Sequence, residues 1–457
     1  MSIISSLTQF SNPLQAYALV NGLVFDSLTG RALAGQAVVI EDAVIRAICP
    51  QAELEQDTPQ VDISGQTLLP GLVDVHVHSE DWHAPLFLAH GVTAVRDTGS
   101  ELNAVLNRRA RWNVSASAPR LVCTGPVIDR PGSTWEPITL RVNTPQDARA
   151  AVDRLIDAGV DQIKTYVMLD LPCYKAIIDQ AHRRGKFVVS HLGRYVDARQ
   201  AAEAGVNEIE HLSGASEALW WERNQASPDW IWMKLWADMD LERANRLIDV
   251  FIERGVWLAI TRLMWERMAL AADPRLMEHP QRKYLPSALA RFWEQYMPHN
   301  LAKRSYPKGM PPPTRAARCQ QAAGMAIFTA QLAQRGARIL IGTDAPLLHL
   351  MPGFSFQDEL LALWACGFSE TALLQAATWG GAQALGLEAE IGSIQPGKQA
   401  DLLLVAGDPT ASLSAMQHIQ AVARLGSWQN PAVLLQQAKD YVRLAPEHSS
   451  GRLDDTY

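Results

Sequence analysis

The sequence predicts an α/β protein: a (β/α)8 TIM barrel with a small β-sandwich domain formed from both chain ends. Between residues 91 and 345, a helical segment, a glycine and a short apolar run ending in a polar residue recur along the chain. Two further apolar runs near residues 72 and 120 bring the strand candidates to eight, the number that closes a barrel. At both ends of the chain, apolar and polar residues alternate between turn signals, as in antiparallel strands.

Length and composition limit the classes of protein to consider. The chain has 457 residues, of which 48% are hydrophobic and 19% charged, with a formal net charge of -7. It is long enough for one large domain and a smaller companion. No charge run suggests a nucleic-acid partner, and no apolar stretch is long enough to suggest a membrane. Five widely spaced cysteines without a CxxC pair argue against disulfides and fit a cytoplasmic location.

The barrel strands are expected where short Val- and Ile-rich runs follow a glycine that can end the preceding helix. They lie near residues 72–78, 93–97, 120–124, 161–166, 187–191, 207–211, 257–261 and 338–344. One helix between them is well marked, because Thr144 can cap it, Pro145 suits its first turn and Gly159 can end it. A doubly wound sheet is the alternative, but the glycine-rich loop expected after its first strand is missing.

Domain boundaries follow from these elements. Residues 1–68 and 391–457 are expected to form the composite β-sandwich domain, and residues 69–390 the barrel. Insertions at about 212–256 and 262–337 are rich in tryptophan. Both follow barrel strands at the end where active sites lie, so the tryptophans form either a wall or lid over the site, or the core of helical insertions or a subunit interface.

Ionisable residues end several of the predicted strands. Asp74, His76 and His78 are spaced by two in the first strand, which predicts that they share one face. Further strands end in polar or charged residues, namely Lys164, His191, His211 and Asp344. Buried charge without a partner is costly, and a metal centre would supply the partner.

These motifs resemble the amidohydrolase superfamily of metal-dependent hydrolases. The segments LLPGLVDVHVH, GVTAVRDTG, IKTY, SHLG, AGVNEIEH, GTDAP and GSIQPGKQADLLL stand in the family's order over nearly the whole chain. The chain looks most similar to the binuclear, prolidase-like branch, which is related to imidazolonepropionase. The resemblance implies that the metal ligands are His76, His78, Lys164, His191, His211 and Asp344.

The resemblance also implies the chemistry. Two divalent ions are expected, with Zn²⁺ favoured by imidazole and carboxylate ligands, and Lys164 would bridge them as a carboxylated side chain. A metal-bridging hydroxide would attack an amide (C–N) bond of a small-molecule substrate, such as an Xaa-Pro dipeptide or an N-acyl amino acid, with Asp344 as general base. Tyr166 could hydrogen-bond the scissile carbonyl as a catalytic residue. Arg194, Tyr195 and His349 are candidate substrate-binding residues.

Other activities fit the same residues. Relatives of this branch hydrolyse lactones or organophosphate esters on a similar centre. A mononuclear deaminase or cyclic-amidine hydrolase would use a single metal and would not need Lys164, and a non-catalytic binding protein would have lost the metals. The sequence leaves the substrate open, and a homo-oligomer is also left open.

Overall fold

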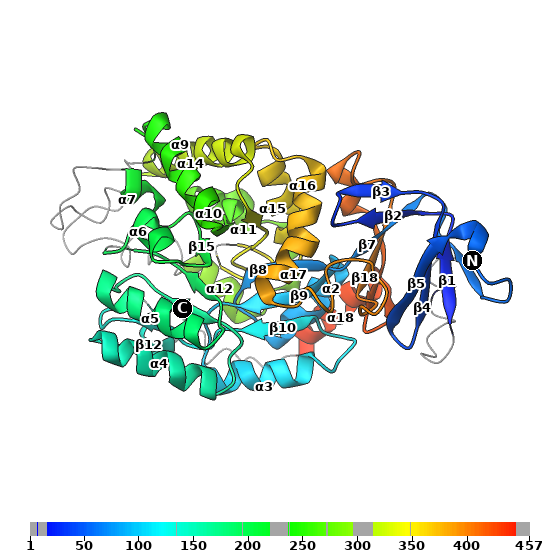
Figure 1. The fold of residues 1–457 in the computed structure, drawn as a ribbon, viewed down its shortest axis with the longest axis horizontal. Coiled ribbons are helices and arrows are strands. Elements are labelled where there is room, and N and C mark those ends of the chain that lie inside the picture. The colour runs from blue at the N-terminus through cyan, green and yellow to red at the C-terminus, as the bar shows by residue number, and fades with distance from the viewer. Residues whose placement is uncertain are drawn as a thin grey trace.

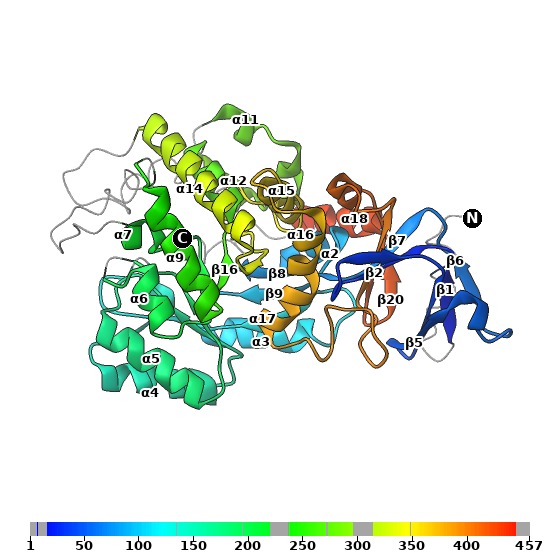
Figure 2. The ribbon, with the colours of Figure 1, turned by 45° about the horizontal axis from the view of Figure 1, so that its top comes forward.

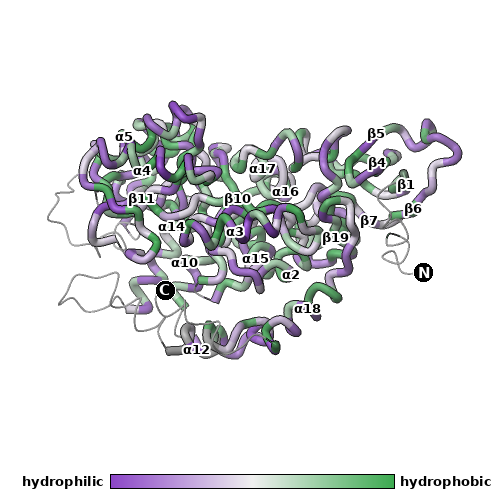
Figure 3. The backbone as a smooth tube through the Cα atoms, turned by 90° about the horizontal axis from the view of Figure 1, so that it is seen from below, coloured by the Kyte–Doolittle hydropathy of each residue, from purple (hydrophilic) through white to green (hydrophobic). Residues whose placement is uncertain are grey.

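A parallel β-barrel surrounded by helices forms the body of the protein, with a β-rich part at one end (Figure 1). This computed structural model describes residues 7, 16–133, 135–193, 195–219, 236, 238–270, 273–295, 314–347 and 349–444. The helices lie outside the strands, so the apolar runs of the strands are covered on both faces (Figure 3).

The predicted TIM barrel is confirmed. Its strands are β8 (Leu72–Val77), β9 (Val92–Asp97), β10 (Arg120–Cys123), β13 (Ile163–Thr165), β14 (Val188–Ser190), β15 (Glu208–Glu210), β16 (Trp257–Ala259) and β17 (Ile339–Leu340). Paired neighbours among them are parallel. The ring closes where Val75 N–H donates to the Ile341 carbonyl at 3.0 Å and Asp161 N–H to the Cys123 carbonyl at 3.0 Å.

Two short strands, β11 (Val127–Asp129) and β12 (Thr139–Arg141), follow β10 in the chain. They extend the sheet at the edge of β13. They were not among the predicted strands. Strand β11 pairs with the carboxyl end of β13. It follows β10 without an intervening helix, so the pattern of helix, glycine and apolar run does not mark it.

Helices cover the outside of the barrel. They include α2 (Ala84–Ala89), α3 (Leu102–Trp112), α4 (Pro145–Asp157), α5 (Leu171–Arg183), α6 (Ala198–Glu203), α9 (Leu241–Arg254), α14 (Arg315–Arg335), α15 (Phe354–Trp364) and α16 (Glu370–Gln375). Helix α4 is the one predicted from its ends. The Thr144 hydroxyl accepts from the Asp147 N–H, and Pro145 occupies the first turn.

The β-rich part consists of two sheets that share one core. The first sheet has the order β5-β4-β1-β6, and the second has the order β20-β19-β18-β7-β2-β3. The strands are β1 (Tyr17–Val20), β2 (Leu23–Asp26), β3 (Arg31–Leu33), β4 (Gln36–Glu41), β5 (Val44–Pro50), β6 (Gln60–Asp62), β7 (Gln66–Pro70), β18 (Leu402–Ala406), β19 (Ile419–Arg424) and β20 (Ser427–Gln429). Strand β7 pairs with β18, so both ends of the chain build the second sheet.

Two of these pairings differ from the expected antiparallel arrangement. Strands β1 and β6 are parallel, as are β2 and β7. The alternation of apolar and polar residues indicates which face of a strand is buried. It does not indicate the direction of the neighbouring strand, so the parallel pairs could not be predicted from it.

The carboxyl-terminal segment returns to the barrel as a helix. Helix α18 (Pro431–Leu444) packs on α2 of the barrel (Figure 2), and Leu434 meets Leu88 in a small apolar cluster. The predicted domain boundaries stay a prediction. None of the helices in the described ranges is both long and apolar enough to cross a membrane.

The tryptophan-rich insertions contribute to apolar clusters where they are described. Trp236 packs on Phe328 with ring centroids 5.5 Å apart, and Trp293 lies in a cluster with Trp82 and Met264 near the ends of β8 and β16. Trp220, Trp221, Trp230 and Trp232 lie outside the described residues. Within the described parts of the insertions, Trp236 and Trp293 are buried and Trp265 is partly buried.

Candidate metal centre

Strand β8 places His76 and His78 at the mouth of the barrel, but Asp74 does not join them. Val73 and Val75 pack among residues of the barrel interior, and the register of β8 against β9 shifts between Asp74 and Val77. This irregularity reverses the face that the strand presents, so the expected alternation over the whole strand was wrong. The Asp74 carboxylate instead accepts the Thr343 hydroxyl at 2.7 Å.

Asp344 lies between these two imidazoles. Its Oδ1 is 3.1 Å from His76 Nε2 and 3.2 Å from His78 Nε2. Burial alone would raise the pKa of Asp344, but His76, His78 and His211 hold it well below its usual value. Asp344 is therefore a carboxylate at neutral pH, the form that binds a cation or accepts a proton.

Two more histidines, His191 and His211, complete a cluster of four imidazoles. The rings of His76 and His211 have centroids 4.5 Å apart, and those of His211 and His191 are 4.7 Å apart. Burial lowers the pKa of His191 to about 3, and it also lowers the pKa values of His76 and His211. Neutral imidazole is the form that binds metals.

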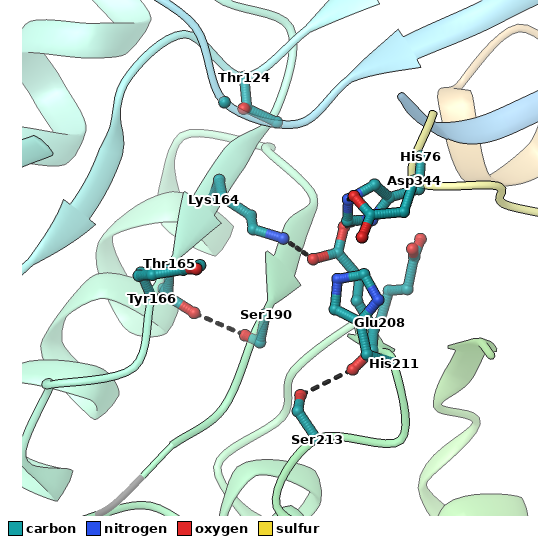
Figure 4. A network of polar contacts seen from close by, with 12 residues as sticks. His76, Thr124, Lys164, Thr165, Tyr166, Ser190, Glu208, His211, Ser213 and Asp344 are labelled. Carbon is teal, nitrogen blue, oxygen red and sulfur yellow. Dashed lines mark hydrogen bonds and ion pairs between the residues drawn. The ribbon is translucent and has the colours of Figure 1, made fainter. Parts of the chain in front are cut away.

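Lys164 reaches the same site from β13 (Figure 4). Its amine contacts the Glu210 carboxylate. Both side chains are buried, with exposures of 2% and 0%. Burial, with the Arg96 guanidinium nearby, lowers the pKa of Lys164 well below its usual value. A lower pKa makes it easier for the Lys164 ammonium to lose a proton, and the amine that results is the form that can take up CO₂.

Glu210 is a site residue that the sequence reasoning missed. Its Oε1 lies 2.9 Å from His76 Nδ1, and it can therefore fix the His76 ring with Nε2 turned toward Asp344. Glu210 also forms a possible metal-binding group with His76 and His211. The sequence feature that could have identified Glu210 is the NEIEH segment, in which Glu208 and Glu210 are two residues apart and so point to one face of the strand.

The VRDTG motif supports the site from β9. His78 Nδ1 donates to the Gly99 carbonyl at 3.3 Å, which leaves Nε2 free to face Asp344. The Asp97 carboxylate accepts the Ser79 N–H and hydroxyl at 2.8 and 2.6 Å. The loop after His78 is thus held on the neighbouring strand, and this role of the motif had not been predicted.

A charged layer lies deeper in the barrel. Arg96 forms an ion pair with Glu208, and its guanidinium donates to Gln162 Oε1 at 3.0 Å. Both charged side chains are fully buried. Because β9 and β15 lie across the barrel from each other, this pair spans its interior below Lys164.

Comparisons with known proteins agree with this fold and site. The amidohydrolase family profile matches residues 67–429. The chain belongs to the amidohydrolase family. Members of this family are metal-dependent, and membership supports a hydrolase that acts on carbon–nitrogen bonds. The NagA composite domain profile matches residues 16–68.

Among solved structures, the amidohydrolase is similar to a bottromycin amidohydrolase, with a TM-score of 0.70 and 22% identity over 97% of this chain and 94% of that one. It is also similar to a Xaa-Pro dipeptidase, with a TM-score of 0.67 and 20% identity over 91% of this chain and 100% of that one. An adenine deaminase of Serratia proteamaculans (strain 568) is 32% identical over 118 residues, 24% of this chain. That match spans 20% of the length of the deaminase.

The donor set of this amidohydrolase fits divalent metal ions. One group of atoms within 4.8 Å of each other comes from His76, His78 and Asp344. Imidazole and carboxylate donors suit Zn²⁺ and related ions. All six predicted ligands converge on the barrel mouth.

The predicted substrate residues have different positions. The Tyr166 ring lies 4.9 Å from that of His191, and burial raises the pKa of Tyr166, so its hydroxyl keeps the proton that it could donate. Tyr195 is 37% exposed. His349 packs on Trp293 and lines a small pocket with it. Arg194 lies outside the described residues.

Proposed function

We propose that this amidohydrolase cleaves an amide bond of a small substrate, such as an Xaa-Pro dipeptide or an N-acyl amino acid, at a binuclear metal centre. The convergence of Asp344 on two imidazoles, with two more imidazoles and Lys164 beside them, carries the proposal. The fold similarity to a Xaa-Pro dipeptidase and a bottromycin amidohydrolase supports the substrate class.

In this proposal, His76 and His78 hold one ion and His191 and His211 hold the other. Carboxylated Lys164 joins the two sites, and Asp344 completes the first. Zn²⁺ is the proposed metal, because the cluster offers nitrogen and oxygen donors without a thiolate. A cationic Lys164 would repel both ions, which is why the carboxylated form belongs to the proposal.

The bound ions would lower the pKa of water and polarise the oxygen of the scissile group. Asp344 would accept a proton from the bound water, because its carboxylate is buried and ionised and lies 3.1 and 3.2 Å from the Nε2 atoms of His76 and His78. The Trp135 indole N–H donates to the Tyr166 hydroxyl oxygen at 2.6 Å. Since that bond occupies an oxygen lone pair, the Tyr166 proton is left to donate to a substrate carbonyl.

A mononuclear deaminase is the second candidate, and two observations favour it. The adenine deaminase similarity is one, and the contact between Lys164 and Glu210 is the other. If Glu210 held Lys164 as an ammonium, the lysine would not bridge two ions. A lactone or organophosphate ester hydrolase would use the same binuclear centre and differs only in its substrate.

Metal analysis and substrate screening test these proposals together. Purified protein loaded with Zn²⁺ and bicarbonate should bind about two ions per chain and hydrolyse dipeptides or N-acyl amino acids faster than lactones, phosphate esters or adenine. Lys164→Ala should lose this activity, and short carboxylic acids should partly restore it. One ion per chain with adenine deamination would contradict the proposal, and a chain that binds no metal would contradict catalysis at this site.

A further inference from the structure

A buried glutamate on α15 holds the segment that follows strand β16. Glu359 is 0% exposed, and its two oxygens accept the N–H groups of Arg262 and Leu263, each at 2.7 Å. These are the first residues of helix α10 (Arg262–Ala269). Thr261 precedes them but makes no side-chain cap bond, so the cap comes from a residue nearly a hundred positions away. Burial raises the pKa of Glu359 to about 8, and the two amide bonds favour its ionised form. That form offers one acceptor to each amide at the positive end of the helix.

The same segment touches His211 at two places. The Thr261 hydroxyl lies 2.7 Å from His211 Nδ1, and the Trp265 indole N–H donates to the His211 carbonyl oxygen at 3.1 Å. With the proton on Nδ1, His211 donates to Thr261 and turns Nε2 outward as a metal ligand. One short segment therefore contacts both the ring and the backbone of this histidine.

Backbone geometry shows why an anchor is needed. His211 and Thr261 have φ angles of 61° and 47°, in the left-handed region that non-glycine residues rarely occupy. Such conformations persist only where the surroundings enforce them. Glu359 supplies that constraint for Thr261, because it binds the two amides that follow.

We infer that Glu359 is a positioning residue for the metal centre. Through residues 261–265 it fixes the ring of His211, and it thereby sets the affinity of the ion bound by His191 and His211. This inference rests on the proposed binuclear function. The ion bound by His76 and His78 does not depend on the segment.

The test measures the affinity of each Zn²⁺ ion by chelator competition, together with the melting temperature of the metal-free protein. Glu359→Gln keeps the shape but offers one acceptor to two amides, and Thr261→Val removes the hydroxyl at nearly constant volume. Each substitution should lower the affinity for one of the two ions by about 10- to 100-fold, the usual effect of losing an outer partner of a ligand. The affinity for the other ion should stay within a few-fold of wild type. Thr261→Ser keeps the hydroxyl and should therefore keep the wild-type affinity for both ions.

Asp240→Asn is the matched control. Asp240 also accepts two backbone N–H groups at a helix start, in this case on α9, so its loss weakens a cap without touching His211. If Glu359→Gln lowers the melting temperature like Asp240→Asn but leaves both affinities unchanged, the cap is only structural and the inference is wrong. Trp265→Phe should lower the affinity for the same ion as Thr261→Val does. Because this variant keeps Glu359, it can still be measured if Glu359→Gln does not fold.

Failure of the binuclear function has a different signature. Wild-type protein that binds a single ion, with the same affinity in Thr261→Val, would overturn both the binuclear function and the role of Glu359. Wild-type protein that binds two ions, neither weakened in any of these variants, would overturn the role of Glu359 alone.

Discussion

Replacing Glu210 by glutamine distinguishes the two chemical forms of Lys164. In the metal-free protein, the Lys164 ammonium would pair with the Glu210 carboxylate inside the barrel. In the metal-loaded protein, a carboxylated Lys164 would be an anion facing a second anion. The same substitution therefore removes an attraction in one form and a repulsion in the other.

The structure gives the size of the effect. Removing one partner of a buried ion pair costs about 3–5 kcal/mol, because the remaining charge stays buried. Lys164 and Glu210 are 2% and 0% exposed, so the metal-free Glu210→Gln protein should lose stability in this range. In the loaded protein, glutamine still offers an oxygen to His76 Nδ1, and the loss should be smaller by at least about 2 kcal/mol.

Urea unfolding of wild type and Glu210→Gln, each without metal and with saturating Zn²⁺ and bicarbonate, measures this difference. Glu208→Gln is the control, since Glu208 pairs with Arg96 whether or not metal is present, and its cost should be the same in both forms. Equal losses for Glu210→Gln in the two forms would mean that Lys164 remains a cationic amine, and the reasoning for a bridging carbamate would be refuted.

Three other outcomes are expected. Asp344→Asn should lower kcat at least about 100-fold, as loss of a general base does; a variant with full metal content and near-normal kcat would assign the base elsewhere. Tyr166→Phe should lower kcat about 100-fold at unchanged metal content, as loss of a carbonyl hydrogen-bond donor does, and an effect on KM alone would contradict that role. Burial lowers the pKa of His90 to about 4, so His90 alone should account for up to about 3 kcal/mol of the stability that the metal-free protein loses as pH falls from 6.5 to 4. His90→Gln should reduce that loss in urea titrations, and an unchanged pH dependence would show that His90 takes no part.

Much of the barrel could be predicted because its signal is local. A glycine that ends a helix and a run of β-branched residues lie next to each other in the chain, and the ring order of the strands follows the chain order. The additional strand β11 and the parallel pairing of β1 with β6 depend on neighbours far away in the sequence. Neither leaves a pattern within a few residues, so neither could be predicted.

The six ligand candidates could be predicted for the same reason, since each ends a strand. Their partners could not. Gly99, Glu210 and Thr261 each contact a ring nitrogen of a histidine on another strand, and spacing along one strand does not report which neighbour a ring nitrogen meets. Glu210 came nearest to being predicted, because NEIEH places two acids on one face.

Left-handed backbone conformations distinguish the mouth of the barrel from its interior. His211, Thr261 and Asp344 all have φ angles near 50–60°, and each follows the end of a barrel strand. A left-handed non-glycine residue costs roughly 1–3 kcal/mol, so these three positions together oppose folding by several kcal/mol. Within the barrel strands no non-glycine residue is left-handed, and the interior holds the Arg96–Glu208 pair together with small apolar side chains such as Ala94 and Ala259. At the mouth, part of the strain therefore lies in residues that turn polar side chains into the site, and the buried carboxyl group of Glu359 offsets it by binding the backbone beside Thr261.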